Sequence, residues 1–459
     1  MIRNPSTRDY LAISVFWLAV SFFWGALLYS VLQSRVQTFV EIEYSKAHLT
    51  YIAPAATAKN SVETPQQKEI ESLQANRLSW LLGTGALLSM VTQLVFGALS
   101  DNTRSRWGRR KPFLVIGTVL ASLGVFAFPY AQNYAQLFAV FLWIQVFLNV
   151  ASGPYSALIP DLIPFEYHGK ASAFMGFFSL VGRTGGMVAG AIALQQKGDI
   201  GLNALTISFL VLLNGLMLTT ALMTHEDSTS NISSTGSFAH TLTGIFRVDL
   251  RGHSSFVWVL VSRFVIMTGV YTILPFLLYY LMSGYGLTKN DALKQLVVIA
   301  LLVNIMGLLA TFPAGLASDR TSKKNVIYVT CALCVIGGLG FVFSQSIVFA
   351  LVAAGIFGLG YGAFSAVDWA LVCNVLPEGE PAKYMGLWSC ADTVPQIVAP
   401  FLGSAVATWT IAHYNASVGY RAVMFTAIVW FVLGTFFIRF VKERAAQNVE
   451  IDPNVIPAV

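Results

Sequence analysis

Four charged residues lie inside long apolar stretches of the sequence: Arg183, Arg263, Asp368 and Asp392. A charge at the centre of a membrane helix costs about 2.5 to 3.5 kcal/mol, so it is rare unless it has a partner or lines a cavity. Counted from the inner ends of their helices, the last three lie about 12 to 14 Å deep. Arg263 can therefore pair with either carboxylate. The group is either a static ion pair or an ion-coupling site at which one carboxylate is protonated for part of a cycle.

Arg183 stands apart from these three residues. It lies about 20 Å into its helix, counted from Lys170, in a segment rich in small residues. The first six apolar stretches contain no acidic residue except Asp161 at an inner end. A guanidinium without a local counter-ion is a candidate functional group, and its fork of donors suits sugar hydroxyls or a carboxylate. We predict that Arg183 binds substrate, with pairing to Asp368 or Asp392 as the alternative.

Other polar and aromatic residues in the apolar stretches are of the types that hold a sugar. Amides and hydroxyls hydrogen-bond to sugar hydroxyls, and an aromatic ring covers an apolar sugar face. Individually, most aromatic residues in such stretches face lipid or pack, whereas a buried amide needs a polar partner. Beside Arg183, the predicted substrate-binding residues are Trp24, Gln33, Gln145, Asn149, Tyr271, Asn304 and Trp369, with Tyr29 and Tyr361 as further candidates.

The elements that position these residues are predicted to be membrane helices. Hydrophobic residues make up 56% of the chain and charged residues 11%, whereas a soluble domain is about a quarter charged. Continuous apolar runs of about 20 residues cross a bilayer as helices, and they lack the alternation of a β-barrel. We predict an all-α integral membrane protein with twelve transmembrane helices. The predicted spans are 11–33, 78–100, 112–131, 134–158, 170–195, 201–223, 255–281, 292–316, 325–344, 346–376, 383–410 and 419–441.

Two sequence patterns occur twice. GALSD at 97–101 and GLASD at 315–319 are each followed by a basic run, and ALIPDLIP at 157–164 returns as ALVCNVLP 213 residues later. They predict two pseudo-symmetric six-helix bundles, as in transporters built from repeats. The predicted domains are 1–223 with a long outer loop at 34–77, a cytoplasmic linker at 224–254, the second bundle at 255–441 and a tail at 442–459. Residues 64–77 could form an amphipathic helix, but we favour a solvated insertion.

The repeated acidic and basic loops are predicted to form the inner gate. A carboxylate at the end of one helix can face the positive N-terminus of the next, and the basic side chains can pair with carboxylates such as Asp161 or Glu166. Such pairs would form when the gate closes and break when it opens. The alternative is that the cations only set topology and contact lipid headgroups. The predicted gating residues are Asp101, Arg109, Arg110, Asp161, Asp319 and Arg320.

The charge distribution predicts the orientation and limits the partners. Lys and Arg concentrate in the short loops that are cytoplasmic if both termini are cytoplasmic. This predicts a multi-pass protein of the cell (inner or plasma) membrane, and we expect a monomer. The net charge of +6 is spread over separate loops, which argues against a nucleic-acid partner. Cys331 and Cys334 lie in an apolar span without His or acidic neighbours, so we expect no metal and no cofactor.

The sequence resembles a known family at two motifs. SDNTRSRWGRRKPF at 100–113 and GPYSALIPDLIP at 153–164 are similar to the corresponding loops of the major facilitator superfamily. The gap between Asp101 and Gly108 is longer than in the general family pattern. In this it looks more like the sucrose-transporter and glycoside/pentoside/hexuronide-cation symporter branches. The resemblance implies a central cavity lined by spans 1, 4, 7 and 10, with spans 2, 5, 8 and 11 flanking it.

These observations predict a secondary transporter and no enzyme. The chain has no phosphate-binding Walker loop, so an ion or solute gradient has to drive transport. We predict symport of a sugar or glycoside with a proton or another cation, by alternating access. One alternative is a carrier or exporter of another solute, such as a drug, a pterin or a tetrapyrrole. The other is a non-transporting membrane scaffold or assembly factor, but a scaffold has no need to bury Arg183 and Asp368.

Overall fold

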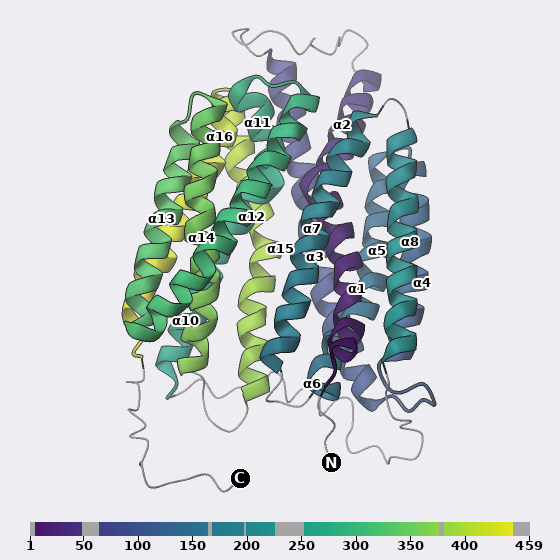
Figure 1. Ribbon diagram of the computed structural model, residues 1–459. Coiled ribbons are helices and arrows are strands. Elements are labelled where there is room, and N and C mark those ends of the chain that lie inside the picture. Colours follow the sequence, from purple (N-terminus) through teal and green to yellow (C-terminus); the bar gives the residue numbers. More distant parts are fainter. Residues whose placement is uncertain are drawn as a thin grey trace, which may run out of the picture.

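The protein is a bundle of long helices (Figure 1). The computed structural model describes residues 5–47, 64–163, 168–196, 199–224, 252–375 and 381–443. Within those ranges the secondary structure is helical and contains no strand. Twelve helices are long and apolar enough to cross a membrane, which confirms the predicted fold class.

The helices fall into two groups of six spans, with several spans divided into consecutive segments. In the first half they are α1 (Thr7–Ala26), η1 (Leu27–Val31), α2 (Leu32–Ala47), α3 (Pro65–Asn102), α4 (Lys111–Ala127), η2 (Phe128–Tyr130), α5 (Tyr134–Ser156), α6 (Leu158–Leu162), α7 (His168–Gln195) and α8 (Ile200–Met223). In the second half they are α10 (Ser254–Ile273), η4 (Leu274–Phe276), α11 (Leu277–Tyr285), α12 (Lys289–Arg320), α13 (Lys323–Phe343), α14 (Ile347–Val375), α15 (Pro381–His413), α16 (Ala416–Phe437) and η5 (Ile438–Phe440).

Each half packs mainly on itself. In the first half α1 contacts α7 and α8, and α4 contacts α5 and α8. In the second half α10 contacts α15 and α16, while α12 and α13 both contact α14. The two halves meet where α3 runs beside α15 and where α7 approaches α12 (Figure 1). We call the end at which α1 begins the inner end, since the charge pattern predicts it to be cytoplasmic, and the opposite end the outer end.

Glycines allow α7 to lie unusually close to α1. Gly182, Gly186 and Gly190 recur one turn apart and all face α1. A Cβ atom built on Gly186 would lie 1.9 Å from the carbonyl oxygen of Phe22, far inside van der Waals contact. Small residues at this spacing let two membrane helices approach backbone to backbone. The contact fixes the position of Arg183, which lies on α7 between the first two glycines.

The predicted solvated insertion at 34–77 is wrong for its described parts. Span 1 continues as helix α2 to Ala47, and span 2 begins at Pro65, well outside the predicted membrane segment. Thr64 caps α3, because its hydroxyl accepts from the amide of Gln67 and the Gln67 side chain accepts from the Thr64 amide. The ion pair between Glu43 and Arg77 joins the two extensions. The two helical extensions are therefore stabilised by an ion pair between their charged side chains, beyond the outer end of the predicted membrane segments. Residues 48–63 lie outside the described ranges.

Span 1 contains one turn of π-helix, from Leu27 to Val31. In this turn the amide of Leu32 bonds to the carbonyl of Leu27, five residues back. Gln33 supports the turn, because its side-chain amide donates to the carbonyl of Leu28 over 2.6 Å. Tyr29, one of the candidate substrate-binding residues, lies within the turn. π turns are frequent at functional sites.

Candidate functional site

The structure brings Arg263, Asp368 and Asp392 together from three helices of the second half. The guanidinium of Arg263 on α10 donates to Asp368 on α14 and lies 3.4 Å from a carboxylate oxygen of Asp392 on α15. The two carboxylates differ in access to water. The Asp368 side chain is 3% exposed and that of Asp392 is 30% exposed. Asp368 is therefore the enclosed partner of Arg263, and Asp392 is the more exposed partner.

The Arg263 guanidinium packs on the ring of Trp388. The ring of Trp388 lies under it, with 3.6 Å between the guanidinium carbon and the ring centroid, an arrangement that attracts a cation to the ring face. Trp369, a predicted substrate-binding residue, packs edge-on against Trp388 at 4.8 Å. Trp388 was not among the residues predicted from the sequence. Its position four residues before Asp392 on the same helix places both side chains on one face, and this spacing could have identified it.

Tyr271 and Gln396 extend the polar group toward the first half. The hydroxyl of Tyr271 donates to Asp392 at 3.2 Å, and the Gln396 amide donates to the Tyr271 hydroxyl at 3.1 Å. Gln396 was not predicted. The 213-residue offset of the repeat that ends spans 4 and 10 also relates Arg183 to Gln396. This offset could have identified Gln396 from the sequence.

Arg183 faces the second half from α7. Its guanidinium lies within electrostatic reach of three tyrosine hydroxyls, those of Tyr29, Tyr361 and Tyr271, and its side chain remains exposed. The ion pairs of the described residues do not include Arg183. Because Tyr271 bonds to Asp392 and lies within electrostatic reach of Arg183, a series of polar groups extends across the interface from Arg183 to Asp368. We call this group the central polar chain; it consists of Arg183, Tyr29, Tyr361, Tyr271, Gln396, Asp392, Arg263 and Asp368.

The other predicted substrate-binding residues lie outside the central polar chain. Trp24 is half-buried and packs on neighbouring phenylalanine rings. Gln145 and Asn149 are buried, and the Asn149 amide bonds to Gln145. Asn304 donates to a carbonyl of its own helix, and Gln33 is fully buried at the π turn. In this conformation their amides are used mainly for helix packing, and their role in binding stays a prediction.

The basic loop between α3 and α4 is anchored to Asp161. Arg109 and Arg110 both reach this carboxylate, at 2.6 and 2.9 Å, and Arg110 also donates to the hydroxyl of Ser100. All four residues belong to the first half. Opening between the halves therefore leaves these ion pairs in place. They brace the inner end of one bundle and do not connect the two.

For the remaining predicted gating residues, the described structure shows no ion pair that tests a gating role. Arg320 is exposed in the last turn of α12. The side chains of Asp101 and Asp319 lie outside the described part of the structure, as does Glu166. The gating roles predicted for the repeated loops are thus still predictions.

The side-chain contacts described between the halves beyond the central polar chain lie toward the outer end. Tyr279 on α11 donates to the carbonyl of Gln33 at 3.1 Å, and the rings of Trp80 on α3 and Phe401 on α15 meet at 5.2 Å. Outward of both, Ser283 approaches Glu71. The halves therefore contact each other at the outer end, while the Arg183 and Asp392 side chains remain partly exposed.

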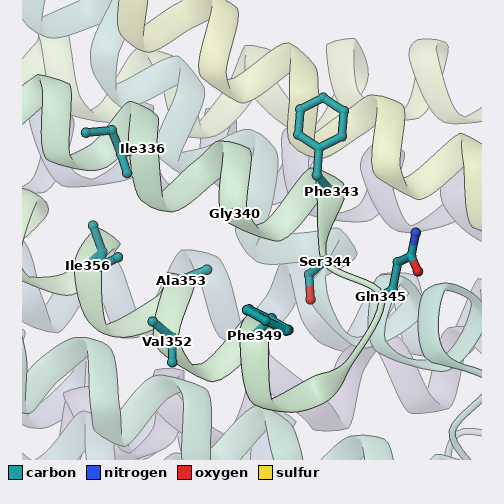
Figure 2. Close-up of a pocket in the computed structure, with 9 residues that line it drawn as sticks. All are labelled: Ile336, Gly340, Phe343, Ser344, Gln345, Phe349, Val352, Ala353 and Ile356. Atoms are coloured by element: carbon teal, nitrogen blue, oxygen red, sulfur yellow. The ribbon is translucent and has the colours of Figure 1, made fainter.

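A groove far from these charges lies on the outer half of the second bundle. Figure 2 shows it between the end of α13 and the start of α14. Its wall is mostly apolar, and Phe343 and Phe349 are about 70% exposed. Such a surface faces lipid and offers few polar groups, so it does not compete with the central polar chain as a substrate site. The described residues also contain no cluster of His, Cys, Asp or Glu suited to a metal ion.

Comparison with known proteins agrees with this architecture. A family model described as Major Facilitator Superfamily matches residues 10–400. The inner membrane metabolite transport protein YhjE of Escherichia coli (strain K12) is 29% identical over 157 residues, which are 34% of either chain. The sucrose transport protein SUC3 of Arabidopsis thaliana is 25% identical over 140 residues, which are 26% of this chain and 23% of that protein. The matched segments thus span about a third or less of these relatives.

A similar fold is seen in solved structures. A D-xylose-proton symporter superposes with a TM-score of 0.68 over 95% of this chain and 99% of its own, at 15% sequence identity. At this identity the likeness establishes the fold alone.

Proposed function

This chain belongs to the major facilitator superfamily, a family of membrane transporters, and we propose that it carries a sugar or glycoside together with a proton or another cation. The central polar chain is the observation that supports this proposal. It contains Arg183, whose guanidinium can donate hydrogen bonds to a substrate, and Asp392, whose carboxylate can bind a proton. Tyr271 lies between them, within electrostatic reach of Arg183 and hydrogen-bonded to Asp392. The partial match to a sucrose transport protein supports a sugar.

In this proposal Asp392 carries the proton. A carboxylate that takes up and releases a proton needs contact with water, and Asp392 is ten times as exposed as Asp368. Its partners, the Tyr271 hydroxyl and the Arg263 guanidinium, stabilise the ionised form. When a proton binds to Asp392, Arg263 keeps Asp368 as its counter-ion. The ion pair between Arg263 and Asp368 therefore survives protonation, and Arg263 is not left without a counter-ion.

Binding and opening are linked because the central polar chain spans both halves. Arg183 belongs to the first half, whereas Tyr271 and Tyr361 belong to the second. A substrate that bonds to both sides holds the halves at a fixed separation at this level. The halves can then rock about that level, so that the site opens to one side of the membrane at a time.

Uptake into proteoliposomes tests the proposal. We expect labelled sugars to accumulate when the outside is more acidic than the inside, and only to equilibrate when the two sides have equal pH. Asp392→Asn should abolish accumulation and keep exchange of substrate across equal pH. Asp291→Asn removes an exposed carboxylate at the outer surface, so it serves as the matched control and should accumulate normally.

Two results would contradict the proposed coupling. Normal accumulation by Asp392→Asn would show that another group carries the proton. Accumulation that follows a sodium gradient and ignores a proton gradient would assign the coupling to a different cation. If sugars were not transported and another solute were, the sugar assignment would fail while the transporter assignment would stand.

A further inference from the structure

The charges of the central polar chain are distributed unevenly between the two halves. Arg263 has two carboxylate partners, so the group it forms with Asp368 and Asp392 carries one net negative charge. Arg183 carries one positive charge on the opposite side, and the described ion pairs leave it without a carboxylate. The first half therefore presents a cation that lacks a carboxylate partner in the described ion pairs to the space between the bundles.

The polar groups around the Arg183 guanidinium are tyrosine hydroxyls, which can both accept and donate. Its guanidinium offers several N–H groups, and the hydroxyls of Tyr29 and Tyr361 lie within reach of it from two other helices. Both hydroxyls come from half-buried side chains. A guanidinium fork with added hydroxyl donors matches the two oxygens of a carboxylate, which can accept from all of them at once. Uncharged sugar hydroxyls would leave Arg183 without an anionic partner.

We infer that the substrate is an acid, a monoanion of sugar size whose carboxylate binds Arg183, and that each anion crosses with one proton so that no net charge moves. This inference rests on the proposed function, since it assigns a substrate class to the same site. Arg183 and the two tyrosines bind the carboxylate, and the remainder of the molecule extends toward Tyr271 and Trp369.

The position of Asp392 explains the link between anion and proton. It is faced by Arg263 and Tyr271 from α10, by Asp368 and Tyr361 from α14, and by Gln396 on its own helix, while Arg183 lies beyond Tyr271 and Tyr361 across the interface. An anion at Arg183 places a second negative charge close to Asp392. Like charges disfavour each other's ionised form, so the bound anion favours protonation of Asp392. By linkage, a protonated Asp392 favours binding of the anion.

The sign of the pH dependence follows from this linkage. A sugar carboxylate stays ionised above about pH 4, so lowering the pH from 7.5 to 5.5 leaves the ligand charged and favours the protonated form of Asp392. The acid therefore binds more tightly at pH 5.5. In Asp392→Asn the side chain is neutral at both values, and affinity should no longer depend on pH.

Binding to the purified, detergent-solubilised protein tests the inference with matched ligands. D-Glucuronate and D-galacturonate are compared with their methyl esters and with D-glucose and D-galactose, which keep the ring and lose the charge. We expect the acids to bind and the neutral partners to bind at least about ten-fold more weakly, since each charge-assisted bond is worth about ten- to hundred-fold in affinity. Arg183→Gln should remove the preference for the acid, and Lys294→Gln, at an exposed outer position, should leave it unchanged.

Transport by the same protein separates this inference from the proposed function. Accumulation of the neutral sugars driven by a pH gradient, with no preference for the acids, would overturn the inference and support the proposed function. Binding of the acids without any effect of a pH gradient would support the charge assignment and overturn proton coupling. Binding of neither set would contradict both. With a pH gradient held constant, an imposed membrane potential should leave the uptake rate of the acid unchanged, and a clear dependence on potential would refute electroneutral transport.

Discussion

Gly186 is the tightest point of contact between α7 and α1, and replacing it with alanine should disturb both stability and substrate binding. The added Cβ atom would lie 1.9 Å from the carbonyl oxygen of Phe22, and the next nearest atoms belong to the same backbone. Backbone cannot rotate away as a side chain can. Ordinary contact begins at 3.4 Å, so the two helices would have to separate by about 1.5 Å at this level.

The cost can be estimated from other cases of overpacking, which destabilise by about 1–3 kcal/mol. Arg183 lies three residues before Gly186, and it would move with α7 away from Tyr29 on the neighbouring span. A shift of this size exceeds the roughly 0.5 Å within which a binding group has to be held. We therefore expect Gly186→Ala to lower the melting temperature by a few degrees and to weaken substrate binding.

Gly176→Ala provides the control for this prediction. Gly176 lies on the same helix, and a Cβ atom there meets nothing within 4 Å. Both changes replace a helical glycine with the best helix former, so they gain equally from backbone propensity. The melting temperatures and substrate affinities of the two variants are compared in one detergent. Equal values for the two would refute the idea that close approach of the helices positions Arg183.

Three further outcomes are expected. Asp368→Asn should lower the melting temperature more than Asp392→Asn, since breaking a fully buried pair costs about 3–5 kcal/mol and Asp392 is partly solvated; equal losses would contradict the assigned difference in burial. Arg110→Gln should destabilise the protein more than Arg109→Gln, whose exposed ion pair is worth about 0–1 kcal/mol, and thermal unfolding with the opposite order would refute this. Tyr279→Phe removes a hydrogen bond between the halves worth about 1 kcal/mol; we expect faster labelling of a cysteine introduced near the outer end, and an unchanged rate would show that this bond does not hold the outer end closed.

The sequence predicted the fold because membrane helices leave a strong signal. A helix in lipid has to satisfy its backbone hydrogen bonds internally and present an apolar surface, so length and hydropathy alone identify the twelve spans. The outer extensions were misjudged for the same reason. Residues 34–47 and 64–77 are polar, and hydropathy does not distinguish a solvated loop from a helix held by pairs such as Glu43 with Arg77.

The candidate site was predictable in part. The rarity of charges in spans identified Arg183, Arg263, Asp368 and Asp392, and helical rise placed the last three at one depth, where the structure pairs them. Depth carries no information about the direction in which a side chain points around its helix. Gln33 and Asn304 were therefore predicted as binding residues by type, although both bond to carbonyls of their own span.

Aromatic and amide neighbours were the hardest to predict. Trp388 and Gln396 belong to common residue types in membrane spans, and only their spacing from Asp392 and from Arg183 sets them apart. Contacts such as the ring of Trp388 under a guanidinium depend on how three helices cross, which a sequence without its fold does not specify.

The π turn at Leu27–Val31 changes the phase of span 1. One additional residue in a turn rotates everything beyond it by about 100° relative to a regular α-helix. The segment before the turn contacts α7 and α8, and the segment after it contacts α3 and α5. A single helix thereby serves two different sets of neighbours in succession. Deleting one residue between Leu27 and Val31 would restore a uniform helix and rotate the outer segment of span 1. The carbonyl of Gln33, which accepts the hydrogen bond from Tyr279, would then turn away from the second half.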